Sequence, residues 1–205
     1  MPAINERQLR EDLVQAGRLC YQQGLLVALD GNLSARLSDD LLLCTPAGCH
    51  KGMLSPDDMI VVDMDGKVVR GNGSPTSELA MHLACYRERP DIQAVVHAHP
   101  PTCIAFTVAG VSMARCVLPE VILSLGTVPT LDYDTTGTQA LADRIGEAVV
   151  RHDAMMMDRH GAVCVGSSPL DAFCKLETIE HRAKIMKAAR ALGQIRDLPA
   201  EESVH

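Results

Sequence analysis

The chain has 205 residues, of which 47% are hydrophobic and only 2% aromatic, so it is long enough for one domain with a sizeable aliphatic core. Its net charge is −7 and it has no basic run, which excludes a surface that tracks nucleic acid, since such surfaces need clustered Lys and Arg. No apolar run approaches the roughly 18–20 residues that cross a bilayer, and the N-terminal stretch "MPAINERQLRED" lacks the apolar segment of a signal peptide.

Eight cysteines are present, and no two of them form a C-x-x-C pair. Most stand in apolar contexts, which is typical of reduced, mostly buried thiols rather than of a disulfide framework. We therefore predict a cytoplasmic protein with no membrane or nucleic-acid partner.

The first elements in the chain are a helix and two hairpins. Asn5 is predicted to cap the helix, in which apolar residues recur at helical spacing. Residues 33–37 and 40–45 are predicted to form the two strands of a hairpin. The stretch "MIVVDMDGKVVRG" predicts a second hairpin with Asp65 and Gly66 in its turn.

The middle of the chain alternates helix and strand patterns. "SPTSELAMHLACYRERP" predicts a helix that Thr76 or Ser77 caps, with Glu78 in its first turn. "IQAVVHAH" predicts a strand, and "TTGTQALADRIGEAVVRH" predicts another helix. Between them, residues 100–137 contain several prolines and short apolar runs, and neither helix nor strand is assigned there.

The C-terminal part of the chain has the clearest sequence signals for its secondary structure. "AMMMDRHGAVCVG" predicts strand, tight turn and strand, and the last helix begins after the cap Ser168 and runs to about Leu192. Hairpins mixed with separate helices predict an α/β protein with a largely antiparallel sheet. We predict one domain over residues 1–205, with an ordered core of about 5–195 and a flexible tail at 199–205.

Two histidines close the strand pattern "AVVHAHPP". Side chains two residues apart in a strand point to the same face, so His97 and His99 are neighbours there. Two imidazoles so placed can bind one divalent ion, at Zn–N distances of about 2.0–2.1 Å. The alternative is a hydrogen-bonded pair of histidines at a strand end.

A catalytic zinc usually takes three protein ligands and keeps one position open. His160 is the best third candidate, because it stands between two apolar strands where Gly161 permits a tight turn. His82 is a weaker candidate because it lies inside a predicted helix. Glu78 is either a charge–dipole contact at a helix N-terminus or a general base that also touches the metal.

Four stretches form a recognisable joint pattern: "GNLSARL", "TPAGCHKGMLSPDDMIVVDMDGKVV", "PTSELAMHLACYRERPDIQAVVHAHP" and "RHGAVCVG". Together they resemble the class II aldolase/adducin family, and within it the L-fuculose-1-phosphate aldolases. The resemblance covers roughly residues 5–190. It implies a three-layer α/β/α fold around a mostly antiparallel sheet, and a homotetramer with active sites at subunit interfaces.

The resemblance also implies roles for the candidate residues. His97, His99 and His160 match the family's zinc ligands, although Mn²⁺ or Co²⁺ could take the place of Zn²⁺. Glu78 matches the carboxylate that binds zinc at rest and moves the proton at the carbon next to the carbonyl. Zinc in such a site polarises the ketose oxygens and stabilises the enediolate. We expect such a base to need a pKa moved toward neutrality.

The family holds the substrate phosphate on backbone amides and small hydroxyl residues from three loops. The matching residues here are Gly31, Asn32, Gly48, Thr76 and Ser77. A helix N-terminus beside the last two is a favourable anion site.

Two positions of this phosphate site depart from the aldolases. Leu29 and Ala47 stand where the aldolases have threonines, so two hydroxyl groups are missing. Lys51 either replaces them as a point charge or is a solvated loop lysine. A carboxylate could bind in the same place as a phosphate.

The second departure from the aldolases concerns the residue that acts as the acid of the reaction. The aldolases use a tyrosine that the adjacent subunit provides from the segment after the H-x-H strand, but "VLPEVILSLG" contains none. Glu120 stands at about this place, where methylthioribulose-1-phosphate dehydratases have a catalytic glutamate. Its alternative role is that of a solvated interface residue, and Tyr133 is the alternative proton donor.

The leading hypothesis is a zinc-dependent lyase that cleaves a small phosphorylated ketose by retro-aldol chemistry. The alternative is dehydration or decarboxylation of a sugar phosphate or sugar-acid phosphate, which uses the same enediolate. A pentulose-phosphate 4-epimerase is disfavoured because those relatives have aspartate at the position of Glu78. A non-enzymatic adducin-like module is disfavoured because all three histidines are present.

Overall fold

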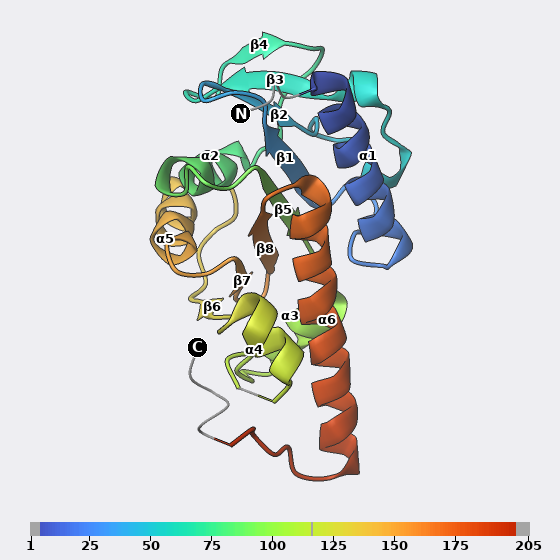
Figure 1. The fold of residues 1–205 in the computed structure, drawn as a ribbon, viewed down its shortest axis with the longest axis vertical. Helices are drawn as coiled ribbons and strands as arrows, with labels where there is room; N and C mark the ends of the chain where they lie inside the picture. The colour runs from blue at the N-terminus through green and yellow to red at the C-terminus, as the bar shows by residue number, and fades with distance from the viewer. Residues whose placement is uncertain (1–4, 116, 200–205) are drawn as a thin grey trace.

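The computed structural model describes residues 5–115 and 117–199. The predicted flexible tail therefore lies outside the described residues except for Pro199, and so does Cys116. The elements form three layers, in which helices cover both faces of a single sheet (Figure 1). This arrangement confirms the predicted α/β fold.

The sheet has eight strands in the order β4-β3-β2-β1-β5-β8-β7-β6. All neighbouring strands are antiparallel except β6 and β7, which are parallel. The strand bounds are β1 Asn32–Arg36, β2 Leu41–Cys44, β3 Ile60–Asp63, β4 Val68–Arg70, β5 Ala94–Ala98, β6 Thr130–Leu131, β7 Ala154–Met157 and β8 Gly161–Gly166. Because β5 lies at the centre of the sheet, both of its faces are buried, and it carries the first histidine of the H-x-H pair.

The helices divide between the two faces of the sheet (Figure 1). Their bounds are α1 Glu6–Gln22, α2 Leu79–Glu88, α3 Pro101–Val108, α4 Pro119–Leu125, α5 Gln139–Val149 and α6 Pro169–Leu192, with short 3-10 turns η1 Lys51–Met53 and η2 Pro56–Asp58. One core packs α1, α3, α4 and α6 against the sheet, and a second core packs α2 and α5 against the opposite face.

Alternation along the central strands decides which side chains face which helices. Leu33 of β1 and Val96 of β5 belong to the core under α1 and α6. Val95 belongs to the core under α2, and residues two apart share a face. His97 and Asn32, which are paired in the β1–β5 register, therefore face the α2 layer.

Two predicted helix caps are confirmed, those at Asn5 and Ser168, whereas neither Thr76 nor Ser77 occupies the N-cap position of α2, which is Glu78. The side chain of Asn5 accepts hydrogen bonds from the backbone N–H groups of Arg7 and Gln8. Ser168 caps α6 by accepting from the N–H of Asp171, and the helix ends at Leu192. These local signals specify the helix boundaries because each satisfies backbone N–H groups that have no partner inside the helix.

Two expectations are corrected. The segment 100–137 contains α3, α4 and β6, so it is more regular than its prolines suggested. Pro101 and Pro119 occupy the first helical position, where the missing N–H costs nothing. Glu78 is not in the first turn of α2 but is the residue before it, and its side chain makes no cap hydrogen bond.

The structure agrees with the prediction that the cysteines are reduced and mostly buried. All seven cysteines among the described residues are free, and only Cys174 is exposed. None of the helices in the described part of the chain is long and apolar enough to span a bilayer.

Candidate metal centre and active-site pocket

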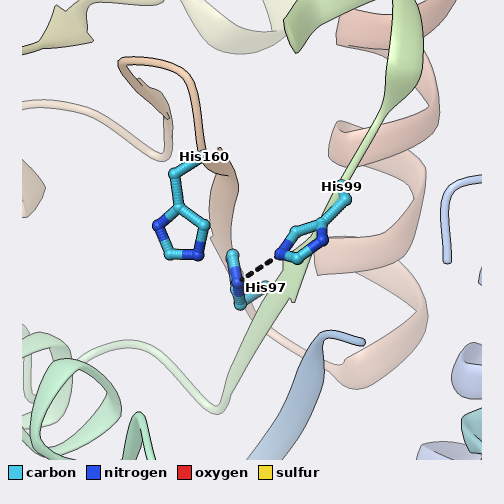
Figure 2. A group of neighbouring side chains, drawn as sticks. All are labelled: His97, His99 and His160. Carbon is cyan, nitrogen blue, oxygen red and sulfur yellow. Dashed lines mark hydrogen bonds between the residues drawn. The ribbon is translucent and has the colours of Figure 1, made fainter. Parts of the chain in front are cut away.

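Three histidines meet where β5 ends beside the turn between β7 and β8. His97 lies on β5, His99 follows the strand, and His160 stands in the turn before β8 (Figure 2). One ring nitrogen from each residue lies within 4.8 Å of the corresponding atoms of the other two. The spacing of the first two histidines and the tight turn of the third thus produce one cluster, as the sequence predicted.

Hydrogen bonds at the far side of two rings fix which nitrogen faces the cluster. Nδ1 of His97 donates to the carbonyl oxygen of Ala162 at 2.9 Å, and Nδ1 of His99 lies 3.4 Å from the carboxylate of Asp30. Both partners are acceptors, so each Nε2 carries a lone pair. The two Nε2 atoms are only 3.1 Å apart, joined by the dashed line in Figure 2. Two lone pairs that face each other fit a cation bound between them.

Glu78 completes the donor set. Its Oε2 lies 3.1 Å from Nε2 of His97, and its Oε1 lies 3.3 Å from Nε2 of His160. Oε1 is buried and has no hydrogen-bond partner among the described residues. Three imidazoles and one carboxylate are a donor set that suits Zn²⁺, and Mn²⁺ or Co²⁺ accept similar ligands.

The protonation states suit metal binding. Burial lowers the pKa of His160 to about 4 and also lowers that of His99, so both rings are neutral near pH 7. Burial alone would raise the pKa of Glu78, but its contacts with His97 and Asn32 outweigh burial and hold that pKa well below the ordinary range. In this arrangement the pKa of Glu78 is not shifted toward neutrality, because His97 and Asn32 stabilise the carboxylate.

A pocket of about 370 Å³ opens beside this cluster. Its lining includes every residue predicted to bind the substrate anion: Gly31, Asn32, Gly48, Lys51, Thr76 and Ser77. Glu78, His99 and His160 line the same pocket, together with Asp30, Thr136 and Gly137, which the sequence did not indicate. The candidate anion site and the candidate metal site thus share one cavity.

The comparison with known families agrees with this geometry. The sequence model described as Class II Aldolase and Adducin N-terminal domain matches residues 11–186. The chain belongs to the class II aldolase and adducin family. The family assignment confirms the resemblance on which the site residues were predicted.

Individual relatives of this member of the class II aldolase and adducin family carry more than one activity in their names. An L-fuculose phosphate aldolase of Methanococcus vannielii is 35% identical over 175 residues, covering 85% of this chain and 93% of the relative. A 3-oxo-tetronate 4-phosphate decarboxylase of Cupriavidus necator is 34% identical over 184 residues, covering 88% and 84%. The crystal structure of YgbL from Klebsiella pneumoniae superimposes with a TM-score of 0.91 at 31% identity, over 98% of both chains. The specific reaction is therefore not decided by similarity.

The two candidate acids lie outside the pocket of their own chain. Glu120 is the second residue of α4 and lines a separate cavity with residues of α6, among them Glu177 and His181. Tyr133 is 56% exposed and packs on the guanidinium of Arg159 at 5.1 Å. Neither side chain lines the pocket that holds His99 and Glu78.

Gly161 has a different role from the one predicted. The left-handed residue in the turn is Arg159, with φ of 55°, and Gly161 is not among the residues with positive φ. A Cβ at Gly161 would instead lie 2.5 Å from the oxygen of Ala98 and within 3 Å of two histidine rings. Glycine is needed there because the rings of His97 and His99 pack against its backbone.

Asp30 is the main candidate site residue that the sequence analysis missed. It follows a loop without a recognisable motif, and only the fold brings its carboxylate to His99. A carboxylate that accepts from the outer ring nitrogen of a ligand fixes the ring and strengthens it as a donor.

Asp30→Ala is expected to weaken metal binding about 10–100-fold, because His99 loses the partner that orients its ring. The measurement is a competition titration against a chelator of known affinity. Asp39→Ala, at an exposed turn position, is the control. Equal metal affinities of the Asp30 variant and the wild type would contradict this role.

Proposed function

We propose that the chain is a zinc-dependent lyase that breaks a carbon–carbon bond next to the carbonyl of a small phosphorylated ketose. The observation that supports this most directly is the carboxylate of Glu78, held between His97 and His160. The pocket around it is lined by residues that suit an anionic substrate group. A carboxylate so placed can leave its ligand position and exchange a proton with a substrate carbon.

The proposed chemistry is retro-aldol cleavage. A divalent cation on the three histidines would polarise the substrate carbonyl and stabilise the negative charge that develops on its oxygen. A base removes the proton of the hydroxyl on the carbon that leaves as an aldehyde, and the electron pair of the broken C–C bond moves to the carbonyl oxygen. Glu78, displaced from the histidines and protonated from solvent, gives this proton to the remaining carbon while the electron pair returns to form the carbonyl, which releases a ketone product.

The substrate phosphate has a suitable place in the same pocket. Thr76 and Ser77 precede the N-terminus of α2, and Asn32 and Gly48 contribute further lining. Lys51 adds a positive charge to this pocket. Only 4% of its surface is exposed, and its Nζ donates to the carbonyl of Leu29 at 2.6 Å. Burial lowers the pKa of Lys51, and an anion beside the ammonium would offset this cost.

Lys51→Met is expected to raise KM for a phosphorylated substrate about 10–100-fold with a smaller change in kcat, because a hydrogen bond to a charged group contributes about 1.5–3 kcal/mol. Steady-state kinetics measure this split. Lys67→Met is the matched control, because that lysine lies in the exposed β3–β4 turn. A KM equal to that of the wild type would return Lys51 to a structural role.

We propose that Glu120 of a neighbouring chain in a homotetramer, the candidate acid of the condensation direction, is the base that takes the hydroxyl proton in the cleavage direction. Its distance from the pocket of its own chain supports a contribution across an interface. Glu120→Gln is then expected to slow turnover by about 100-fold without loss of metal.

A mixing experiment tests this arrangement directly. Oligomers that contain both the Glu120→Gln chain and the His97→Ala chain are expected to regain activity, because some sites combine intact histidines with an intact glutamate. If mixed oligomers are no more active than the separate variants, Glu120 does not act across an interface, and Tyr133 is the next candidate.

Decarboxylation of a sugar-acid phosphate is the second candidate. It needs no base for a hydroxyl proton, since the C–C electron pair moves to the carbonyl as carbon dioxide leaves. Within its described lining, the pocket of one chain contains no acidic side chain besides Glu78 and Asp30. This favours decarboxylation, because that reaction needs no additional base.

Two substrates separate these reactions. Metal-loaded protein is incubated with dihydroxyacetone phosphate in deuterated water, and exchange is followed by NMR; separately, carbon dioxide release from 3-oxo-tetronate 4-phosphate is measured. Exchange without carbon dioxide release supports the aldolase, whereas carbon dioxide release supports the decarboxylase. Neither activity in metal-loaded protein would refute the proposed lyase function for these substrates.

A further inference from the structure

A chain of buried hydrogen bonds leads from Glu78 away from the pocket, between α2 and β1. Nδ2 of Asn32 donates to Oε2 of Glu78 at 2.9 Å, and Oδ1 of the same amide lies 2.5 Å from Nε2 of His82. Nδ1 of His82 lies 2.6 Å from the hydroxyl of Ser34, which lies 3.0 Å from that of Tyr86. Beyond Glu78, each member of this ladder is at most 3% exposed.

The ladder results from matching repeats in a helix and a strand. Glu78 directly precedes α2, and His82 and Tyr86 follow it at intervals of four residues on one face of the helix, while Asn32 and Ser34 are two residues apart on one face of β1. Four helical residues rise about 6 Å, and two strand residues rise about 6.6 Å. Because these distances nearly agree, the side chains of the two elements alternate along the line of contact.

The donor and the acceptor of each hydrogen bond in the ladder can be assigned in only one consistent way. A carboxylate only accepts, so the amide nitrogen of Asn32 faces Glu78 and the amide oxygen faces His82. An amide oxygen also only accepts, so Nε2 of His82 carries the hydrogen and Nδ1 carries a lone pair. The Ser34 hydroxyl then donates to Nδ1 of the ring and accepts from Tyr86. Burial lowers the pKa of His82 to about 3, which keeps the ring neutral and in a single tautomer.

Removal of His82 would leave Oδ1 of Asn32 buried without its donor. An unpaired buried polar group costs about 1–3 kcal/mol, and the amide would lose one of the two hydrogen bonds that fix its orientation. In the turned-over orientation its oxygen would face the carboxylate of Glu78 and repel it. Asn32 also lies opposite His97 in the β1–β5 register, so the amide is held directly beside the candidate metal ligands.

We propose that His82 is a positioning residue that fixes the side-chain amide of Asn32 and, through it, the carboxylate of Glu78. Ser34 and Tyr86 support it by fixing the tautomer of the ring. The inference rests on the proposed role of Glu78 in moving a proton. It assigns a function to a histidine that is neither a ligand nor in contact with the pocket.

Two substitutions separate positioning from simple packing. In His82→Gln the terminal amide nitrogen lies three bonds from Cβ, as Nε2 of histidine does, and it can donate to Asn32. In His82→Asn the amide ends two bonds from Cβ, as Nδ1 does, and it can reach only Ser34. Each variant loses one end of the ladder, so their free energies of unfolding serve as a check for general destabilisation.

The expected result is a large difference in rate between these two variants. His82→Asn should lower kcat for deuterium exchange about 10–100-fold, with KM and metal content unchanged, whereas His82→Gln should keep most of the wild-type rate. Equal rates of the two variants, or a loss that follows the free energy of unfolding alone, would overturn the proposal.

A spectroscopic measurement tests the ladder without any substrate. Two-bond ¹⁵N–¹H correlation spectra of the full-length protein, assigned with the His82→Gln variant, report which ring nitrogen is protonated. The Nε2–H tautomer supports the proposal, and the Nδ1–H tautomer overturns it. If the wild type shows the Nε2–H tautomer but no exchange with any substrate, the proposed function fails while the direction of the ladder is supported.

Discussion

Replacing His97 or His160 with alanine is expected to strip the metal and lower turnover at least about a thousandfold. Each imidazole is one of three donors around a single point, and two remaining histidines do not hold a divalent ion at ordinary free concentrations. Loss of the cation removes several kcal/mol of charge stabilisation, and each 1.36 kcal/mol is a factor of about ten in rate.

Metal content by mass spectrometry, on protein purified without chelator, measures the first effect. His97 is fully buried, so its variant is compared with that of His160, which stands in a turn. His181→Ala, on the exposed side of α6, is the matched control. Stoichiometric metal in both ligand variants would refute the assignment. Chelator treatment of the wild type, followed by Zn²⁺, Mn²⁺ or Co²⁺, then shows which ion restores the rate.

The second large effect is expected for Glu78→Gln. The amide has the shape of the carboxylate and leaves the three histidines in place, so metal content should change little. It cannot take up a proton from carbon, however, and general acid–base catalysis contributes about 10²–10⁴ in rate. Solvent deuterium exchange into dihydroxyacetone phosphate should therefore fall by about this factor.

The electrostatics of the site explain what Glu78 must do to act. Its contacts with His97 and Asn32 hold its pKa low, which makes it a good ligand and a weak base. A substrate that displaces the carboxylate from the histidines removes this stabilisation and raises its basicity. Full exchange activity in Glu78→Gln would show that the residue only supports the metal ligands.

The sequence by itself determined the elements that depend on neighbouring residues. Asn5 and Ser168 cap their helices as predicted, because a cap satisfies N–H groups within one turn. His97 and His99 share a face because the strand period is two. The segment 100–137 was missed because a proline at the first helical position looks like a breaker in the sequence alone.

The tertiary structure alone decided which distant residues share the site. Asp30 reaches His99, and Asn32 reaches Glu78 and His82, through the antiparallel pairing of β1 with β5 and the packing of α2 on β1. Glu120 lies in the first turn of α4 and lines a cavity other than the pocket of its own chain. No local period encodes these placements, because strand order and the faces on which helices pack follow from burial of the whole core.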